Sequence, residues 1–229
     1  GAQWPDMGRE FLKDPVFHQA LSSLDEVFQR EGGFSVVEAL QTSDLGGSAR
    51  IQVLTYAMQI GLTALLRSKG VMPQAIIGHS VGEIAAAVAA GCLTEQEGAV
   101  IVCRRAKLYA QVQGHGAMAL VALSFEKAAQ QLIGRSDIVA AIRSSPSTCV
   151  VSGTTEAVDW YVKRLEKSSV KLWRVQTDIG FYSPMLEQLV SPLQECLDQD
   201  INPQPAITPI YSTSASVPRT TSLRNVEYW

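Results

Sequence analysis

Long hydrophobic runs, clustered cysteines and blocks of basic residues are all missing from this sequence of 229 residues. No apolar stretch approaches the roughly 18 residues of a membrane span, so we predict no membrane partner. The net charge of −3 and the lack of a basic block argue against nucleic-acid binding. The four cysteines form no C-x-x-C motif, which argues against a disulfide scaffold or a structural zinc site and favours a reducing, cytoplasmic location. These cysteines are Cys92, Cys103, Cys149 and Cys196.

Histidine is also scarce, with only His18, His79 and His115 in the whole chain. These residues and the scattered cysteines give no spacing typical of metal ligands, so we predict no bound metal. The pair Gly46-Gly47 is too short for a phosphate-binding loop, and we predict no bound cofactor.

Apolar residues, by contrast, are plentiful. Hydrophobic residues make up 46% of the chain and charged residues 18%, which is typical of a globular protein and excludes a disordered one. The length allows one large domain or two small ones. Because Gly1 does not look like a natural start and Asn225–Trp229 stops without a loop or cap, we expect the chain to be a piece of a longer polypeptide.

The first part of the chain combines helices with one strand. Helix starts are marked by Asp14-Pro15 and by two capping boxes, Ser35 with Glu38 and Thr94 with Glu97. The expected elements are a helix from Asp14 to about Gly33, a short helix after Ser35, a helix over 51–70, a buried strand over 74–78, a helix over 83–90 and a helix from Thr94 to about Val112.

The middle of the chain changes character after residues 114–116. Strands are expected over 117–123, 138–142, 148–152 and 170–175, and helices over 125–133 and 155–167. This order is β-α-β-β-α-β, the split ferredoxin-like unit. A helix from Ser183-Pro184 to about Asp198 and a strand over 207–212 complete the chain.

The strongest local motif is Gly78-His79-Ser80-Val81-Gly82, between a predicted strand and a predicted helix. That context is the one a nucleophile elbow requires. Ser80 would lie at a helix N-terminus, where N–H groups and the helix dipole favour developing negative charge, and the Val81 N–H would be an oxyanion donor. The pentapeptide alone is a weak match, and a plain glycine-rich turn is the alternative interpretation.

The predicted architecture is α/β. We expect a parallel-sheet core like that of the α/β hydrolases, with the β-α-β-β-α-β unit inserted as a small subdomain. The predicted boundaries are 1–113 together with 176–229 for the large subdomain, and 114–175 for the small one.

The stretch Gly78–Ala87 resembles the active-site segment of the acyltransferase domains of polyketide and fatty acid synthases. Three further stretches and one arginine agree in order and spacing: Gly1–Trp4 with Met7–Glu10, Arg105 at 25 positions after Ser80, Asp178–Met185, and the closing Asn225–Trp229. The resemblance covers essentially the whole chain. The sequence of Glu83–Val121 most resembles that of the fungal partially reducing synthases of the methylsalicylic acid type.

The resemblance implies a two-step transfer. Ser80 would take a malonyl group from malonyl-coenzyme A as an ester and pass it to the phosphopantetheine thiol of an acyl carrier protein. It also implies a neighbouring ketosynthase domain, a second oxyanion donor in the backbone N–H of Gln3, and a place for His79 beside the nucleophile, as a structural neighbour counted among the substrate-binding residues.

Arg105 is the residue expected to hold the extender unit. A planar guanidinium binds a free carboxylate through two parallel hydrogen bonds, worth about 2–3 kcal/mol inside a cleft. The alternative is an arginine on a solvated helix face, and residues alone do not separate Arg104 from Arg105. The resemblance, through the spacing from Ser80, favours Arg105.

Two positions bear on substrate size. Family members that choose malonyl tend to carry Phe where Phe181 stands, because a bulky ring crowds an α-methyl branch. The aliphatic Val81 points the same way. A single methyl group is worth only about 1–3 kcal/mol of discrimination, and Phe181 could also be an ordinary core residue.

Tyr182 stands where the family has its catalytic histidine. A phenol with a pKa of about 10 is a poor base near neutral pH, and general-base assistance is commonly worth about 10²–10⁴-fold. We therefore predict that the chain loads malonyl slowly or not at all. The other histidines are expected to be structural or exposed.

Arg143 stands where the family often has a small amide. Its guanidinium would either assist carboxylate binding or lie in solvent, and we favour the second interpretation.

Two other functions stay open. A docking or scaffolding module that keeps the fold without the base would explain Tyr182. An α/β hydrolase would explain the elbow. Against a hydrolase stand the inserted unit, Arg105 and the lack of any histidine after residue 115, where the order Ser, acid, His requires one.

Overall fold

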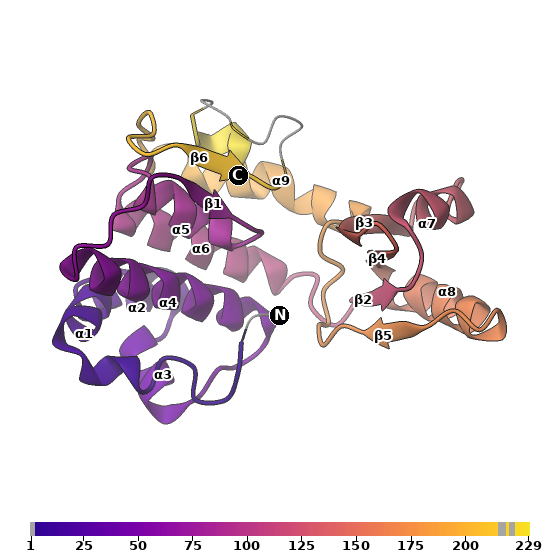
Figure 1. The fold of residues 1–229 in the computed structure, drawn as a ribbon, viewed down its shortest axis with the longest axis horizontal. Coiled ribbons are helices and arrows are strands. Elements are labelled where there is room, and N and C mark those ends of the chain that lie inside the picture. Colours follow the sequence, from indigo (N-terminus) through magenta and orange to yellow (C-terminus); the bar gives the residue numbers. More distant parts are fainter. Residues whose placement is uncertain (1–2, 215–218, 220–222) are drawn as a thin grey trace. The chain divides into compact units, whose positions relative to one another are not determined.

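A computed structural model describes residues 3–214, 219 and 223–229 of the chain. The chain forms two compact units (Figure 1). The larger unit comprises Ala2–Leu108 together with Pro192–Trp229, and the smaller unit is Tyr109–Ser191. The smaller unit begins before and ends after the predicted subdomain of 114–175, because it also holds the segment around Phe181 and Tyr182. The predicted subdomain boundaries stay a prediction.

Helices dominate the larger unit. Its elements are the 3-10 helix η1 (Phe11–Lys13), α1 (Pro15–Ser22), α2 (Asp25–Gly32), α3 (Val36–Thr42), α4 (Ser48–Ser68), β1 (Ile76–Gly78), α5 (Gly82–Ala89), α6 (Glu95–Tyr109), α9 (Val190–Leu197), β6 (Ile210–Ser212) and the 3-10 helix η3 (Val226–Tyr228). Within the described part of the chain, no helix is both long enough and apolar enough to cross a bilayer.

Side-chain caps fix several helix starts where the sequence predicts them. The Asp14 carboxylate accepts hydrogen bonds from the backbone N–H groups of Val16 (2.8 Å) and Phe17 (3.3 Å). Thr94 and Glu97 form a reciprocal capping box, with the Thr94 N–H donating to Glu97 Oε2 (2.7 Å) and the Glu97 N–H donating to Thr94 Oγ1 (3.1 Å). These caps set the start of α1 and of α6, the helix that carries Arg105.

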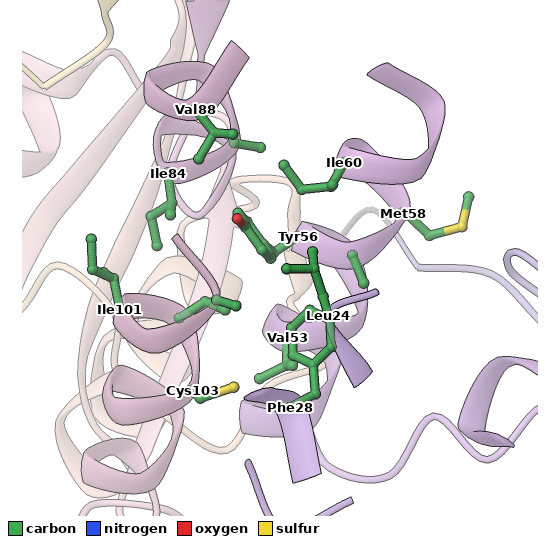
Figure 2. Close-up of a cluster of buried hydrophobic side chains, with 14 of the residues drawn as sticks. Leu24, Phe28, Val53, Tyr56, Met58, Ile60, Ile84, Val88, Ile101 and Cys103 are labelled. Carbon is green, nitrogen blue, oxygen red and sulfur yellow. The ribbon is translucent and has the colours of Figure 1, made fainter. Parts of the chain in front are cut away.

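Part of the core of the larger unit lies between α2, α4, α5 and α6 (Figure 2). Figure 2 shows Tyr56 of α4 among side chains of α5 and α6, including Ile84 and Ile101. The buried Tyr56 hydroxyl donates to the Glu95 carbonyl oxygen (2.7 Å), which satisfies its polar group at the start of α6. Tight packing of α5 against this core holds the helix that follows Ser80.

The described sheet of the larger unit has two strands. β1 and β6 run parallel, with Ile76 opposite Ile210 and Gly78 opposite Ser212. The sequence predicts a buried strand over 74–78, but Ile77 is 70% exposed, so that part of the prediction is wrong. The reason is that the described residues give β1 only one neighbouring strand, while α5 packs beside it.

The smaller unit has the predicted order of elements. These are β2 (Gly116–Val121), α7 (Phe125–Gln131), β3 (Ile138–Ser145), β4 (Thr148–Thr154), α8 (Thr155–Lys167), β5 (Leu172–Arg174) and the 3-10 helix η2 (Pro184–Leu189). The strands form an antiparallel sheet in the order β3-β4-β2-β5. One face packs with α7 and α8 around a core that includes Val121, Val151 and Tyr161. The mixed α/β class, with one parallel and one antiparallel sheet, is therefore confirmed.

Two predicted helices differ from the structure. The helix expected from Asp14 to Gly33 is divided into α1 and α2 at residues 23–24, although it ends at Gly33 as predicted, with Gly33 in the left-handed conformation (φ +80°). The helix expected after Ser183-Pro184 begins as the 3-10 helix η2 and becomes α-helical only at Val190. At the first break, the Asp25 carboxylate in the first turn of α2 accepts hydrogen bonds from the backbone N–H groups of Val36 and Val37, a contact that local patterns do not record.

Candidate active site

Ser80 lies in a tight turn between β1 and α5. Its φ of +55° is in the left-handed region, which costs energy for a residue with a side chain. Two backbone hydrogen bonds close the turn, from the Gly82 N–H to the His79 carbonyl oxygen (3.0 Å) and from the Glu83 N–H to the Ser80 carbonyl oxygen (2.9 Å). The structure thus places Ser80 in a strained strand-turn-helix junction, which is the geometry of a nucleophile elbow.

Gly78 is required by close approach. A Cβ on Gly78 would lie 2.5 Å from the Cα of Glu83 and 2.7 Å from the carbonyl oxygen of Gly82. The strand and the helix therefore approach each other so closely that the turn between them must be sharp. A Cβ on Gly82 would meet only the end of the flexible Gln59 side chain, at 3.2 Å.

The residues beside Ser80 differ in exposure. Ser80 and Val81 are half-buried, whereas the His79 side chain is exposed. The first turn of α5 follows directly, and the N–H groups of Gly82 and Glu83 at its start are already used in closing the turn. An oxyanion formed on an acyl group at Ser80 would meet the positive end of the helix dipole.

Arg104 and Arg105 have different surroundings. The Arg104 guanidinium contacts Glu31 of α2 (3.0 Å) and Asp200 (2.7 Å), and it donates to the Cys196 carbonyl oxygen on α9. The hydrogen bonds from Arg104 hold the pKa of Glu31 below its ordinary value and raise the pKa of Arg104. Arg104 therefore joins α6 to α2 and α9.

Arg105 is half-buried and comes one residue later on α6. Because successive residues of an α-helix are about 100° apart around its axis, Arg105 leaves the helix on a different face from Arg104. The structure thus separates the two neighbouring arginines, which the residues alone do not.

The segment that carries Phe181 and Tyr182 is held against the start of β2 and the end of β4. The N–H groups of Gly114 and Gly116 donate to the Asp178 carbonyl oxygen, at 2.9 and 3.2 Å. A Cβ on Gly116 would lie 2.0 Å from the backbone nitrogen of Gly180, and a Cβ on Gly180 would lie 2.5 Å from the carbonyl oxygen of Gly153. Glycine at these positions allows direct backbone contact, which fixes the segment.

Phe181 and Tyr182 differ in environment. Phe181 is half-buried and packs edge-to-face on Tyr109, with ring centroids 5.2 Å apart. Tyr182 is 46% exposed and has a φ of +60°. The buried Ser183 hydroxyl donates to the Gly180 carbonyl oxygen (2.7 Å) and secures the turn. The left-handed region is unusual for a bulky residue and more often occupied by Asn, Asp or His, so this backbone suits a histidine better than a tyrosine.

The remaining candidates are placed as follows. Gln3 is half-buried, and its side-chain oxygen has no hydrogen-bond partner among the described residues. The exposed Arg143 pairs with Glu126 (2.5 Å) and lies over the Phe125 ring, so its guanidinium is used on the surface of the smaller unit. His18 contacts Ser22 within α1, and His115 is exposed at the start of β2.

The predicted site residues are divided between the two units. His79, Ser80, Val81 and Arg105, together with Gln3, belong to the larger unit. Phe181 and Tyr182 belong to the smaller unit. In the part of the chain that the structure describes, no group of three or more His, Cys, Asp or Glu residues could hold a metal ion.

Glu83 is a residue whose role sequence reasoning missed. Its side chain is only 7% exposed, yet it is a carboxylate in the first turn of α5. It receives hydrogen bonds from Ser212, Thr213 and Tyr228. The sequence does show a glutamate in the first turn after the motif, three residues after Ser80. Its role was not predictable, because its hydrogen-bond partners are 129 to 145 positions away along the chain.

Comparison with known proteins agrees with this geometry. The family described as acyl transferase domain matches residues 1–229. The chain is 54% identical to the 6-methylsalicylic acid synthase of Aspergillus terreus and 51% identical to the mellein synthase of Phaeosphaeria nodorum, in each case over 100% of this chain and 13% of the synthase. The chain therefore spans about an eighth of the length of these relatives.

Solved structures give the same result. The acyltransferase domain of the polyketide synthase PpsC of Mycobacterium tuberculosis matches with a TM-score of 0.91 and 34% identity, over 100% of this chain and 71% of that one. FabD from Acinetobacter baumannii, at 23% identity and a TM-score of 0.84, shares the fold. The resemblance read from the sequence is confirmed, including its narrower likeness to synthases of the methylsalicylic acid type: the chain belongs to the acyl transferase domain family, as an acyltransferase domain of the kind found in polyketide synthases.

Proposed function

We propose that this chain transfers a malonyl group from malonyl-coenzyme A to the phosphopantetheine thiol of an acyl carrier protein, through an ester on Ser80. The observation that carries the proposal is the strained turn at Ser80, with its φ of +55° at the start of α5. Such strain persists where the surrounding structure holds it, and it would present the Ser80 hydroxyl near the positive end of the α5 dipole. We further propose that the parallel β1-β6 pair and this turn belong to a core like that of the α/β hydrolases.

The transfer has two balanced steps. In the first, Ser80 Oγ bonds to the thioester carbonyl carbon, the carbon–sulfur bond breaks, and the serine proton passes to the coenzyme A sulfur. In the second, the carrier thiol attacks the ester, and its proton returns to Ser80. The backbone N–H groups of Val81 and Gln3 would stabilise the oxyanion in both steps.

Arg105 would bind the malonyl carboxylate through two hydrogen bonds. The contacts of Arg104 support this assignment, because they use its guanidinium in joining α6 to Glu31 and Asp200. Phe181 would limit the space beside the α-carbon and so favour malonyl over a branched unit, while His79 would support the turn from beside it. The carrier protein and a neighbouring ketosynthase domain are the proposed partners.

Tyr182 lowers the expected rate. At the position of the family histidine, a phenol does not readily accept the Ser80 proton near neutral pH. A second candidate function therefore follows from Tyr182 alone, namely a docking or scaffold module of the synthase that no longer carries acyl groups.

Mass spectrometry of the intact chain after incubation with malonyl-coenzyme A tests the proposal. We expect the parent chain to be malonylated slowly, at Ser80. Malonylation should be about 10²–10⁴-fold faster in Tyr182→His, and Ser80→Ala should not be malonylated. Absence of an adduct in both the parent and Tyr182→His would favour the scaffold. Equal rates in these two chains would show that residue 182 is not the base.

A further inference from the structure

The Glu83 carboxylate needs partners because it is buried in the first turn of α5. It accepts hydrogen bonds from the Ser212 hydroxyl (2.7 Å), the Thr213 N–H (2.8 Å) and the Tyr228 hydroxyl (2.6 Å). Burial alone would raise the pKa of Glu83, but these hydrogen bonds outweigh it and hold the pKa below its ordinary value. The carboxylate is therefore ionised and firmly held near neutral pH.

Tyr228 comes from the closing segment of the chain, and that segment is itself well packed. Its ring lies under the Arg224 guanidinium (4.2 Å to the centroid) and edge-to-face on Trp229 (5.1 Å). The Trp229 indole N–H donates to the Arg224 carbonyl oxygen (2.8 Å), and the Arg224 side chain is buried. These contacts present the Tyr228 hydroxyl to Glu83 in a fixed position.

The same residues reach the turn at Ser80 from both sides. The Glu83 backbone N–H donates to the Ser80 carbonyl oxygen (2.9 Å), and the Thr213 hydroxyl donates to the Gly78 carbonyl oxygen (3.3 Å). In the sheet, Gly78 lies opposite Ser212. One carboxylate thus joins the helix after the turn, the strand beside it and the closing segment.

We propose that Glu83 and Tyr228 are positioning residues that hold Ser80 in its strained conformation. This inference rests on the proposed role of Ser80 as the acylated nucleophile. Neither side chain is assigned to the malonyl group, so the pair acts on acylation through the turn alone. Loss of the pair should lower the maximum rate of acylation and leave the KM for malonyl-coenzyme A unchanged, because that KM depends on Arg105.

The test uses the Tyr182→His chain as parent and follows formation of the Ser80 ester by rapid quenching and mass spectrometry. Tyr228→Phe removes the hydroxyl and keeps the ring against Arg224 and Trp229. We expect at least a tenfold lower maximum rate in Tyr228→Phe and in Glu83→Gln, because small displacements of a nucleophile are costly. The double variant should be no slower than Glu83→Gln, since both changes break one network.

Tyr56→Phe is the matched control. It removes another buried tyrosine hydroxyl of the same unit, one that donates to the Glu95 carbonyl oxygen at the start of α6 and not to Glu83, while the ring keeps its packing against α5. We expect it to lower thermal stability without changing the maximum rate or the KM of acylation. If Tyr56→Phe slows acylation as much as Tyr228→Phe does, the slower rate comes from lower overall stability, and the positioning role is overturned.

The outcomes separate the two proposals. If the parent forms no ester at Ser80, the proposed function fails and the positioning role fails with it. If the parent is acylated and Tyr228→Phe keeps its full rate, only the positioning role is overturned. A rise in KM with an unchanged maximum rate also overturns it. If Glu83→Gln does not fold, the acylation rate of Tyr228→Phe alone tests whether the pair positions Ser80.

Discussion

At the scale of single residues, Ser80 and Tyr182 share an unusual backbone. Both lie in the left-handed region, at φ +55° and +60°, where a residue other than glycine costs about 1–3 kcal/mol. Close glycine contacts support each turn, at Gly78 for Ser80 and at Gly180 for Tyr182. Asp6, Ser43 and Ser169 share this conformation, so a positive φ alone does not mark a functional position. At Ser80 and Tyr182 it coincides with the proposed nucleophile and with the place that the resemblance gives to the family histidine.

The different surroundings of Arg104 and Arg105 lead to a prediction on specificity. In the Tyr182→His chain, Arg105→Lys should raise the KM for malonyl-coenzyme A by about 30- to 150-fold, because lysine does not reproduce two parallel hydrogen bonds worth about 2–3 kcal/mol. Acetyl-coenzyme A, which has no free carboxylate, should load unchanged. Loading kinetics with both thioesters provide the measurement.

Arg104→Lys is the control for that prediction. It weakens the contacts with Glu31 and Asp200 and should lower the free energy of unfolding without changing the ratio of malonyl to acetyl loading. The assignment would be reversed if Arg104→Lys, and not Arg105→Lys, changed this ratio.

At the scale of elements, the sequence predicted those helix and strand positions that depend on contacts between residues close together in the chain. The α1 start was predictable because Asp14 caps Val16 and Phe17, within three residues. The break between α1 and α2 was not, because Asp25 uses its carboxylate to cap α3 at Val36, eleven residues away. The β-α-β-β-α-β order was predictable since each strand and helix has its own apolar period.

The segment that bears Tyr182 gives a prediction at this scale. Gly116→Ala places a methyl group 2.0 Å from the backbone nitrogen of Gly180, so the segment must move. We expect the free energy of unfolding to fall by about 1–3 kcal/mol, as in other overpacked sites, and loading of the Tyr182→His chain to fall with it. Urea unfolding and the mass-spectrometric loading assay measure the two effects.

Gly134→Ala in the same unit is the matched change. Gly134 has a φ of +83° and open space around its Cα, so alanine there adds backbone strain of about 1–2 kcal/mol and no collision. It should therefore lower stability while loading keeps its rate. If loading fell equally in both variants, the glycine contact would have no specific part in placing Tyr182.

At the scale of the whole molecule, the contacts that join distant segments were beyond prediction. Arg104 meets Asp200 at 96 positions' separation, and Glu83 meets Tyr228 at 145. No periodicity or cap encodes such pairs. The closing Asn225–Trp229 could be read from sequence only as a family signature, although η3 supplies the hydroxyl that satisfies a buried carboxylate. Motifs thus identified the candidate residues, and the fold was needed to show which neighbours hold them.

Acid sensitivity follows from two of these long-range contacts. Hydrogen bonds from Arg104 lower the pKa of Glu31, and hydrogen bonds from Tyr228, Ser212 and Thr213 overcome burial to lower the pKa of Glu83; the ordinary value of both is 4.5. A carboxylate with a lowered pKa in the folded state adds stability above its unfolded pKa, and this stability is lost as the pH falls through the folded value. We therefore expect the free energy of unfolding to be level above about pH 5 and to decrease below pH 4.5.

Urea unfolding over a pH series measures this dependence. Glu31→Gln and Glu83→Gln should each be less stable than the parent at neutral pH and should lose less stability on acidification, because each lacks one carboxylate that must be protonated. Arg104→Met should remove the part of the slope that depends on Glu31 and leave the part that depends on Glu83, since its guanidinium is the main cause of the lowered Glu31 pKa. A parent slope retained in full by all three variants would show that neither carboxylate is stabilised by its distant partners.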